Sequence, residues 1–433
     1  MSAVTSQQLL PCDKTIIIPQ YVGTCWMNAL LMCVFYSEAM RDVVIMYRKK
    51  WASTMPKNEY TNELVAIFDK MARLYKRPNG SDGGFYKTTT PEKILYLLHK
   101  ADPVIFEYRS VRLTSRGTYE IRDGWKSGYT PRLYARKLLH FFGITSVSLD
   151  ANKLTDGSFR LGLSNEHSRT PTTMNKNGKT TYSYKVKSRK EVQQILGSTP
   201  PIISVNIGYS NDWKKKTTVP KPDYYSFGGS FRTIPQEIRF GRSRYILDTV
   251  TLSNVNKGDQ VMGKKGMLTV GSHSIAGVTC NGNRFIYSGW MKKTKDAAKS
   301  NTNVKNTGNI HRVDRPCPLM PFRWDTDRRS FYITNKVCDV QFTPPQPNSV
   351  RFNSIMGNRV HYYVRSDLVK YKTRMLQRLG TVSGKNKLLL GGNIIRRAIT
   401  NVSTRSVRLN QPKPQARPRP QIPIAPRMIK RRR

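Results

Sequence analysis

A cysteine and a histidine far apart in the chain have the residue types needed for nucleophilic catalysis. Cys25 lies in the stretch QYVGTCWMNALL, directly after a Gly-Thr pair, and neither glycine nor proline occurs from there to Trp51. This pattern predicts a helix beginning at Cys25, with Thr24 as its N-cap residue. The positive end of the helix dipole favours a thiolate, the form that a nucleophile needs. Gln20, five residues upstream, could offer its side-chain amide to an oxyanion beside the sulfur.

The histidine is His273, in the stretch GSHSIAGV at the mouth of a predicted strand. A neutral imidazole there could take the thiol proton and later protonate a leaving amine. Each residue could instead be purely structural. Cys25 would then be a small buried side chain of an amphipathic helix, and His273 a hairpin histidine without a catalytic role. Among the other five histidines, His99 and His140 end predicted helices, where the dipole alone favours them.

Both stretches resemble the sequence boxes of ubiquitin-specific proteases. The cysteine box of that family reads Asn-Leu-Gly-Asn-Thr-Cys-Tyr-Met-Asn, and residues 20–28 here read Gln-Tyr-Val-Gly-Thr-Cys-Trp-Met-Asn. Residues 245–290 resemble the histidine box, with Ser-His-Ser where the family has Gly-His-Tyr. The resemblance covers about residues 15–40 and 200–290. It implies a papain-like cysteine protease fold in which Cys25 is the nucleophile, His273 the general base and acid, and Gln20 the oxyanion donor.

The third catalytic residue of that family departs from the pattern. The resemblance places it about sixteen positions after His273, where the chain reads Ser-Gly-Trp and has no Asp or Asn. Ser288 is the side chain there that could accept the imidazole N–H, and a neutral hydroxyl stabilises an imidazolium less than a carboxylate does. A catalytically silent protein of the same fold therefore stays open as an alternative, as does acyl transfer to an amine.

The charge of the chain is strongly positive. Its 433 residues include 74 Lys and Arg against 27 Asp and Glu, a formal net charge of +47. Such a surface attracts anions, although a generally basic proteome would need no specific partner. The resemblance implies a ubiquitin-like conjugate as substrate. Ubiquitin's own C-terminal tail is basic and fits poorly on so basic a protein, so a viral protein is an equally expected substrate. The basic, Asn-rich composition resembles proteins of large DNA viruses.

Six cysteines without a C-x-x-C pair argue against a zinc ribbon, and no metal or other cofactor is expected. The N-terminus has no apolar core typical of a signal peptide, and the most apolar run, Met27 to Tyr36, is too short to span a bilayer. We therefore expect a soluble protein without a membrane partner, with free thiols in a reducing compartment. Host cytoplasm, host nucleus or the virion would all fit.

Periodicity predicts helices first and strands second. Helices are expected over residues 63–75, from Pro91, and over 131–142, and strands over 144–149, 201–207, 245–252, 274–280 and 285–287. This order favours an α+β fold. We expect a helical subdomain at 1–150 with the cysteine box, an antiparallel β subdomain at 151–345 with the histidine box, and a packed extension at 346–367.

The C-terminal tail, residues 368–433, contains 18 Lys and Arg and no acidic residue. Its proline-rich end cannot pack as a helix, so an extended, disordered chain is expected. The charge predicts an anionic partner, either nucleic acid or an acidic capsid surface. A nuclear-import signal and a solvated tail without a partner are the alternatives.

Overall fold

The computed structural model divides into two compact units, residues 1–374 and 375–433. The residues that the structure describes all belong to the first unit: 11–20, 24–78, 80–106, 111–113, 119–121, 131–164, 169–176, 179–186, 188–208, 226–254, 260–263, 266–269, 273–289, 291–292, 315–333, 338–343, 350–354 and 357–369. The predicted tail therefore lies outside the described residues, apart from its first two positions. The subdivision at residues 150, 345 and 367 stays a prediction.

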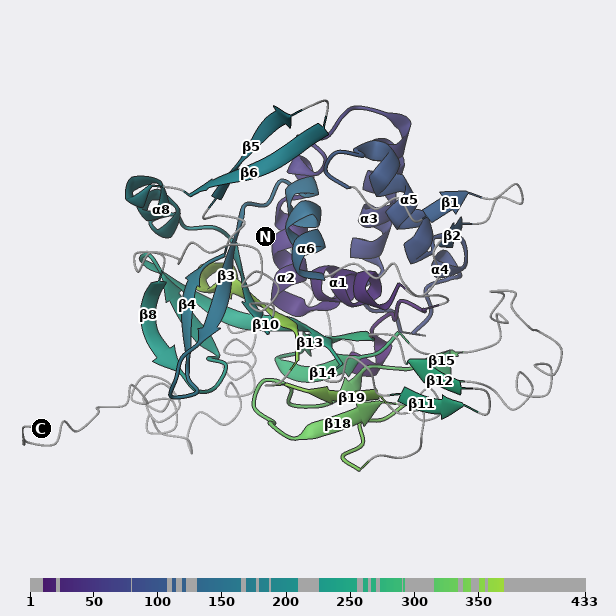
Figure 1. The fold of residues 1–433 in the computed structure, drawn as a ribbon. Helices are drawn as coiled ribbons and strands as arrows, with labels where there is room; N and C mark the ends of the chain where they lie inside the picture. Colours follow the sequence, from purple (N-terminus) through teal and green to yellow (C-terminus); the bar gives the residue numbers. More distant parts are fainter. Residues whose placement is uncertain are drawn as a thin grey trace, which may run out of the picture. The chain divides into compact units, whose positions relative to one another are not determined.

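The described α-helices lie mostly in the first third of the chain (Figure 1). They are α1 (Cys25–Tyr36), α2 (Glu38–Met46), α3 (Glu59–Arg73), α4 (Phe85–Thr88), α5 (Pro91–Ala101), α6 (Pro131–Phe141) and α8 (Arg189–Leu196). Short 3-10 helices span Cys12–Lys14, Arg48–Lys50 and Ser366–Leu368. The helices predicted at 63–75, from Pro91 and at 131–142 are confirmed. No helix in the described part has the length and apolar character needed to cross a bilayer.

The helix that begins at Cys25 ends at Tyr36, whereas the sequence predicts an end near Arg41 or Arg48. The interruption falls at Ser37, and the carboxylate of Asp248 accepts hydrogen bonds from the backbone N–H groups of Ala39 (3.3 Å) and Met40 (2.9 Å). A strand residue thus caps the N-terminus of α2, which is also where a negative charge is favourable. The cap comes from more than 200 positions away, so no local pattern could reveal it.

A ten-stranded sheet forms the centre of the first unit, in the order β17-β14-β13-β10-β20-β7-β3-β4-β8, with β9 also paired to β10. Its strands are β3 (Ser146–Lys153), β4 (Phe159–Leu163), β7 (Ile202–Ile207), β8 (Ser226–Phe231), β9 (Glu237–Phe240), β10 (Ser243–Ser253), β13 (Ser274–Cys280), β14 (Asn283–Tyr287), β17 (Met320–Pro321) and β20 (Arg359–Arg365). The five strands predicted above are confirmed. The expected antiparallel subdomain is wrong at one pair, because β3 runs parallel to β7. The chain is thus a mixed α/β protein.

The remaining described strands form two-stranded hairpins or ribbons. They are β1 (Val111–Leu113) with β2 (Tyr119–Ile121), β5 (Arg169–Lys176) with β6 (Lys179–Val186), β11 (Gln260–Gly263) with β12 (Gly266–Thr269), β15 (Met291–Lys292) with β16 (Arg315–Pro316), and β18 (Ser330–Ile333) with β19 (Val350–Asn353).

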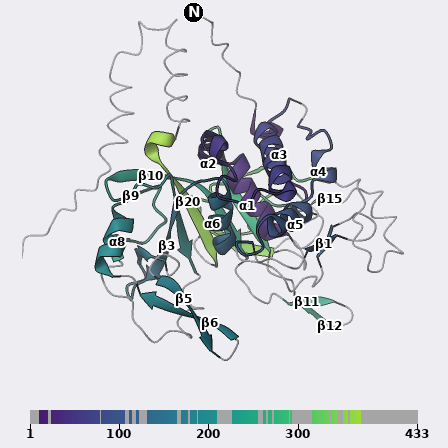
Figure 2. The ribbon, with the colours of Figure 1, turned by 90° about the horizontal axis from the view of Figure 1, so that it is seen from above.

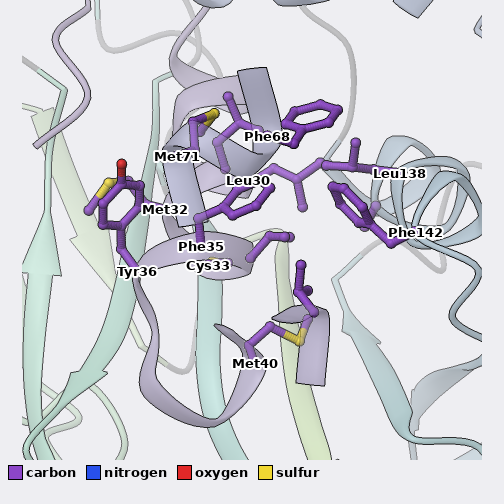
Figure 3. Close-up of a cluster of buried hydrophobic side chains, with 14 of the residues drawn as sticks. Leu30, Met32, Cys33, Phe35, Tyr36, Met40, Phe68, Met71, Leu138 and Phe142 are labelled. Carbon is purple, nitrogen blue, oxygen red and sulfur yellow. The ribbon is translucent and has the colours of Figure 1, made fainter. Parts of the chain in front are cut away.

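Each face of the large sheet is covered by its own hydrophobic cluster. Helices α1 and α2 pack on β10 and β13, with α6 against α1 (Figures 1 and 2). All twelve residues of α1 are buried, and Leu30 and Phe35 meet Phe68 of α3 and Phe142 after α6 (Figure 3). The opposite face packs against aromatic side chains from residues 315–354, including Trp324, Phe331 and Phe352. Cys25 therefore begins a helix that is fixed on every side.

The turn between β13 and β14 has the backbone that its sequence demands. Asn281 and Gly282 have φ of 50° and 76°, the left-handed region in which asparagine and glycine are tolerated best. An Asn-Gly pair between two apolar runs predicts a hairpin turn from the sequence alone, and the structure confirms it. The turn fixes how Ser274 to Cys280 align with Asn283 to Tyr287.

Four of the six cysteines are disulfide-bonded, which corrects the expectation of free thiols. Cys12 bonds Cys280, with their Cα atoms 6.0 Å apart, and Cys317 bonds Cys338 at 5.2 Å. Cys25 and Cys33 are the free cysteines. The first bond links residues 268 positions apart, so the pairing depends on the fold and not on a motif.

Candidate active site

Cys25 is the first residue of α1 and is 7% exposed. Thr24 is the N-cap residue, but its hydroxyl makes no capping hydrogen bond. It donates instead to Oε1 of Glu92 at 3.1 Å, in the first turn of α5. Burial raises the pKa of the Glu92 carboxyl. The start of the candidate nucleophile helix is thus tied to the start of α5.

The thiol of Cys25 lies against Ser274, the first residue of β13. Burial raises the pKa of the Cys25 thiol above its ordinary value, while hydrogen bonds from the backbone N–H and the hydroxyl of Ser274 act in the opposite direction. Burial has the larger effect. The sulfur is therefore a neutral thiol at neutral pH, which corrects the expectation that the helix dipole would favour a thiolate.

His273 directly precedes β13 and is 4% exposed. Its Nε2 atom lies 3.4 Å from Oγ of Ser288, and its ring packs edge-on against Phe352 with centroids 6.0 Å apart. Asn254 holds the histidine backbone on both sides: its Oδ1 accepts from His273 N–H at 3.0 Å, and its own N–H donates to the His273 carbonyl at 3.1 Å. Burial lowers the pKa of His273 to about 3, so the imidazole is neutral.

Gln20 lies beside Gly289, the residue after Ser288. Its backbone N–H donates to the Gly289 carbonyl at 2.9 Å. Its Oε1 atom is buried and has no hydrogen-bond partner among the described residues. A Cβ at Gly289 would lie 2.8 Å from Cβ of Gln20 and 2.7 Å from the hydroxyl of Tyr287. A longer side chain such as Asp or Asn therefore does not fit at 289, and Ser288 presents its hydroxyl to the imidazole instead.

Two further side chains fix the segment that carries Gln20. The hydroxyl of Tyr287 donates to the Ile18 carbonyl at 2.6 Å, and Nδ2 of Asn28 donates to the Pro19 carbonyl at 3.2 Å. Asn28 lies in the first turn of α1, so the helix that begins at Cys25 also holds the segment that contains Pro19 and Gln20 in place. Asn28 belongs to the cysteine box, but the sequence indicates no role for it. Nor does any sequence pattern point to Tyr287, Asn254 or Ser274.

The structure gathers all four predicted site residues into one region through short contacts. Gln20 contacts Gly289, its neighbour Ser288 contacts His273, and Ser274, next to His273, contacts Cys25. Their catalytic roles stay predictions. The chemistry available is that of a neutral thiol and a neutral imidazole in a water-poor setting. No group of three His, Cys, Asp or Glu side chains in the described ranges is arranged to hold a metal ion.

Comparisons with known proteins add little to this geometry. No protein-family model matches the chain, and no curated protein matches it. Among solved structures, the SAGA Ubp8/Sgf11/Sus1/Sgf73 deubiquitinating module bound to ubiquitin aldehyde is 9% identical, covering 82% of this chain and 70% of that one with a TM-score of 0.33. A yeast SAGA module with mutant Sgf73 is also 9% identical, covering 84% and 72% with a TM-score of 0.29. TM-scores this low do not define a shared fold.

Proposed function

We propose that the protein is a cysteine-type peptidase or isopeptidase with a papain-like arrangement similar to that of ubiquitin-specific proteases. One observation carries the proposal: the Cys25 thiol is hydrogen-bonded to Ser274, and the preceding residue, His273, has its Nε2 atom on Ser288. A thiol, a base and a group that orients the base are the three elements of nucleophilic catalysis. They occur here in the order that the two sequence boxes predict.

In the first step, the Cys25 sulfur attacks the carbonyl carbon of the scissile amide while its proton passes to the imidazole of His273. Because Nε2 lies on Ser288, we assign the proton transfer to Nδ1. The C–O double bond becomes an oxyanion, which the side-chain amide of Gln20 would stabilise through its N–H group. This role requires the Gln20 amide to present Nε2 to the oxyanion.

In the second step, the imidazolium gives its proton to the leaving amine, the C–N bond breaks, and a thioester to Cys25 remains. His273 then removes a proton from water, which attacks the thioester and releases a carboxylic acid and the thiol. Thiol and imidazole are both neutral before attack, since burial raises one pKa and lowers the other. Proton transfer therefore accompanies attack, rather than preceding it in a stored ion pair.

For the substrate, we propose a ubiquitin-like conjugate or a viral protein. The net charge of +47 disfavours a basic substrate tail such as that of ubiquitin, because like charges repel. For the C-terminal tail we propose an anionic partner, either nucleic acid or an acidic capsid surface, on the basis of its 18 uncompensated cations.

Thiol labelling tests the proposed reaction. The purified protein is treated with ubiquitin carrying a thiol-reactive group at its C-terminus and, separately, with iodoacetamide. Labelling of Cys25 by the ubiquitin probe, lost in Cys25→Ala and reduced at least a hundredfold in His273→Ala, is the expected result for a deubiquitinase-type enzyme. Cys33→Ala is the matched control, because Cys33 is the other free cysteine and is fully buried in the same helix.

A catalytically silent protein of the same fold is the second candidate. The raised pKa of Cys25 and the hydroxyl in place of a carboxylate at the third position favour it. If His273→Ala leaves the iodoacetamide labelling rate of Cys25 unchanged and no ubiquitin probe reacts, the enzyme proposal is wrong. If only iodoacetamide reacts, and His273→Ala slows it, the pair is active toward another substrate.

A further inference from the structure

Strand β20 carries two buried nitrogen-rich side chains on one face of the central sheet. Arg359 is 2% exposed and His361 is 1% exposed. Alternate residues of a strand point to opposite faces. The hydrophobic cluster beneath the helices includes Val360, Tyr362 and Val364. Arg359 and His361 therefore face the opposite side of the sheet, as does Tyr363, which belongs to the cluster on that side.

Neither side chain has the partners that a buried polar group needs. Nε of Arg359 and both ring nitrogens of His361 lack a hydrogen-bond partner, and no ion pair of Arg359 occurs within the described part of the chain. One guanidinium nitrogen, Nη1, reaches the Gly357 carbonyl only at 3.5 Å. The cross-strand neighbours are aliphatic: Val205 and Ile207 on β7, and Val250 and Leu252 on β10.

A second buried arginine, Arg284, shows how this protein compensates a buried positive charge. Arg284 pairs with Asp325 at 3.1 Å and donates to the carbonyls of Leu247 and Asp248 at 2.8 and 3.1 Å. Its guanidinium also lies 4.9 Å from the centroid of Trp324. Among the described residues, Arg359 has only the long contact from Nη1 to the Gly357 carbonyl, and burying a charge with so little compensation is strongly unfavourable.

The charge of Arg359 persists despite burial. Burial lowers the pKa of Arg359 to about 9, which still leaves the guanidinium protonated at neutral pH. Burial, and then the nearby Arg359 charge, hold the pKa of His361 well below its ordinary value, so the imidazole is neutral. The pair thus offers one full positive charge, several N–H donors and no negative charge.

We propose that Arg359 and His361 form a buried binding site for a small oxyanion, either an inorganic phosphate or a carboxylate. The planar guanidinium matches the oxygen spacing of both groups, and a neutral imidazole adds one N–H donor from two positions along the strand. The anion would neutralise the guanidinium and satisfy the unpartnered nitrogens. The proposed reaction at Cys25 is not part of this inference, because neither residue contacts the four predicted catalytic residues in the described hydrogen bonds.

The test measures how inorganic phosphate changes the thermal unfolding midpoint of the full chain, after exhaustive exchange into a phosphate-free chloride buffer. Ionic strength is held constant, because the basic surface also attracts anions non-specifically. Once phosphate exceeds its dissociation constant, the wild-type midpoint should rise with the logarithm of the phosphate concentration, by about 3 °C at a hundredfold excess. Sodium acetate in a parallel series distinguishes a carboxylate site from a phosphate site.

Three variants separate this site from other cations. Arg359→Leu should lose this rise and, without phosphate, be at least as stable as the wild type. Arg359→Lys keeps the positive charge but loses the planar guanidinium, so it should bind phosphate about tenfold more weakly. This variant tests the site even if Arg359→Leu does not fold. Arg365→Leu is the matched control on the same strand, since Arg365 already pairs with Asp367 at 2.7 Å, and it should keep the full response.

Two results would overturn the proposal. One is a wild-type midpoint that responds to neither phosphate nor acetate. The other is an equal response in wild type and Arg359→Leu, which would place the bound ion on the tail or on surface lysines. Calorimetric titration of phosphate into wild type and Arg359→Lys checks the same difference by direct binding, independently of any effect of the variants on stability.

Discussion

The Nε2 atom of His273 lies 3.4 Å from the Oγ atom of Ser288, and both residues are almost fully buried. This contact places a hydroxyl where a charged or amide side chain would be expected beside a catalytic imidazole. The next residue cannot supply one, because a side chain at Gly289 would collide with Gln20 and Tyr287. The contact orients the ring but offers little stabilisation to an imidazolium.

Removing the hydroxyl tests whether this contact serves catalysis. Ser288→Ala should slow the labelling of Cys25 by about tenfold, the effect of one neutral hydrogen bond that orients the base. The second-order rate constant with the thiol-reactive probe is the measurement. Ser204→Ala is the matched control, since it removes another buried hydroxyl, which pairs with Ser148 on β3. Equal rates in Ser288→Ala and wild type would remove Ser288 from the site.

Asn254 is predicted to position His273 without touching the substrate. Its Oδ1 accepts the His273 N–H, so Asn254→Ala leaves a buried donor unsatisfied and should cost about 1–2 kcal/mol of stability. The same change should lower the labelling rate of Cys25. Asn254→Asp keeps the acceptor and should restore most of the rate. If alanine and aspartate variants label equally fast, the clamp has only a structural role.

Buried neutral histidines predict acid sensitivity. The folded-state pKa of His273 is about 3, below the ordinary 6.5, so the unfolded chain binds more protons between these values. The stability that this group contributes is complete above pH 6.5 and is lost as the pH falls toward 3, by up to ~5 kcal/mol. Urea unfolding between pH 7 and 4 measures the slope.

His273→Gln should flatten that slope, because glutamine does not titrate. His361 has the same sign, since burial also lowers its pKa, so part of the slope should remain in the single variant. Ser204→Ala, a change at a buried residue whose side chain does not titrate, is the control and should leave the slope unchanged. A slope identical in wild type and His273→Gln would mean that His273 is accessible to protons in the folded state.

The sequence predicted what local patterns encode. Pro91 begins α5, the Asn281–Gly282 turn joins two strands, and the strand at Ser274–Cys280 has its predicted bounds. Each depends on a few neighbouring residues. The candidate site residues could also be proposed from the sequence, because Cys25 and Gln20 share one short motif and the histidine box lies in one stretch.

What the sequence missed depends on contacts between distant segments. Asp248 ends the first helix by capping the second, although it looks like an ordinary polar residue in a strand. Strand β20 lies between β10 and β7 in the middle of the sheet, where we expected only a packed extension. The alternation of Val360, Tyr362 and Val364 was the available signal. The direction of the Cys25 pKa shift could not be predicted either, because burial by the whole fold outweighs the hydrogen bonds to the thiol from Ser274 and the start of the helix.

The Cys12–Cys280 bond predicts a redox-dependent stability. It closes a loop of 268 residues and ties the segment before Gln20 to the end of β13. Reduction should therefore cost roughly 3–5 kcal/mol, mainly through the freedom gained by the unfolded chain. The measurement is the urea midpoint with and without a thiol reductant. Cys12→Ser should show most of the loss already without reductant, whereas Cys33→Ser, a change at a free cysteine, should keep the reductant effect. A wild type indifferent to reductant would show that these cysteines remain thiols.

The basic tail predicts salt-dependent binding to polyanions. Truncation after Arg374, at the boundary between the two compact units, removes residues 375–433 and leaves the described fold intact. If the tail binds phosphates, the logarithm of the binding constant for a short DNA duplex should fall linearly with the logarithm of salt concentration, with a slope of about −0.9 per neutralised phosphate. The truncated protein should bind more weakly and with a smaller slope. Equal slopes for the two proteins would place the nucleic-acid contacts on the first unit, whose own excess of Lys and Arg would then be the surface to mutate.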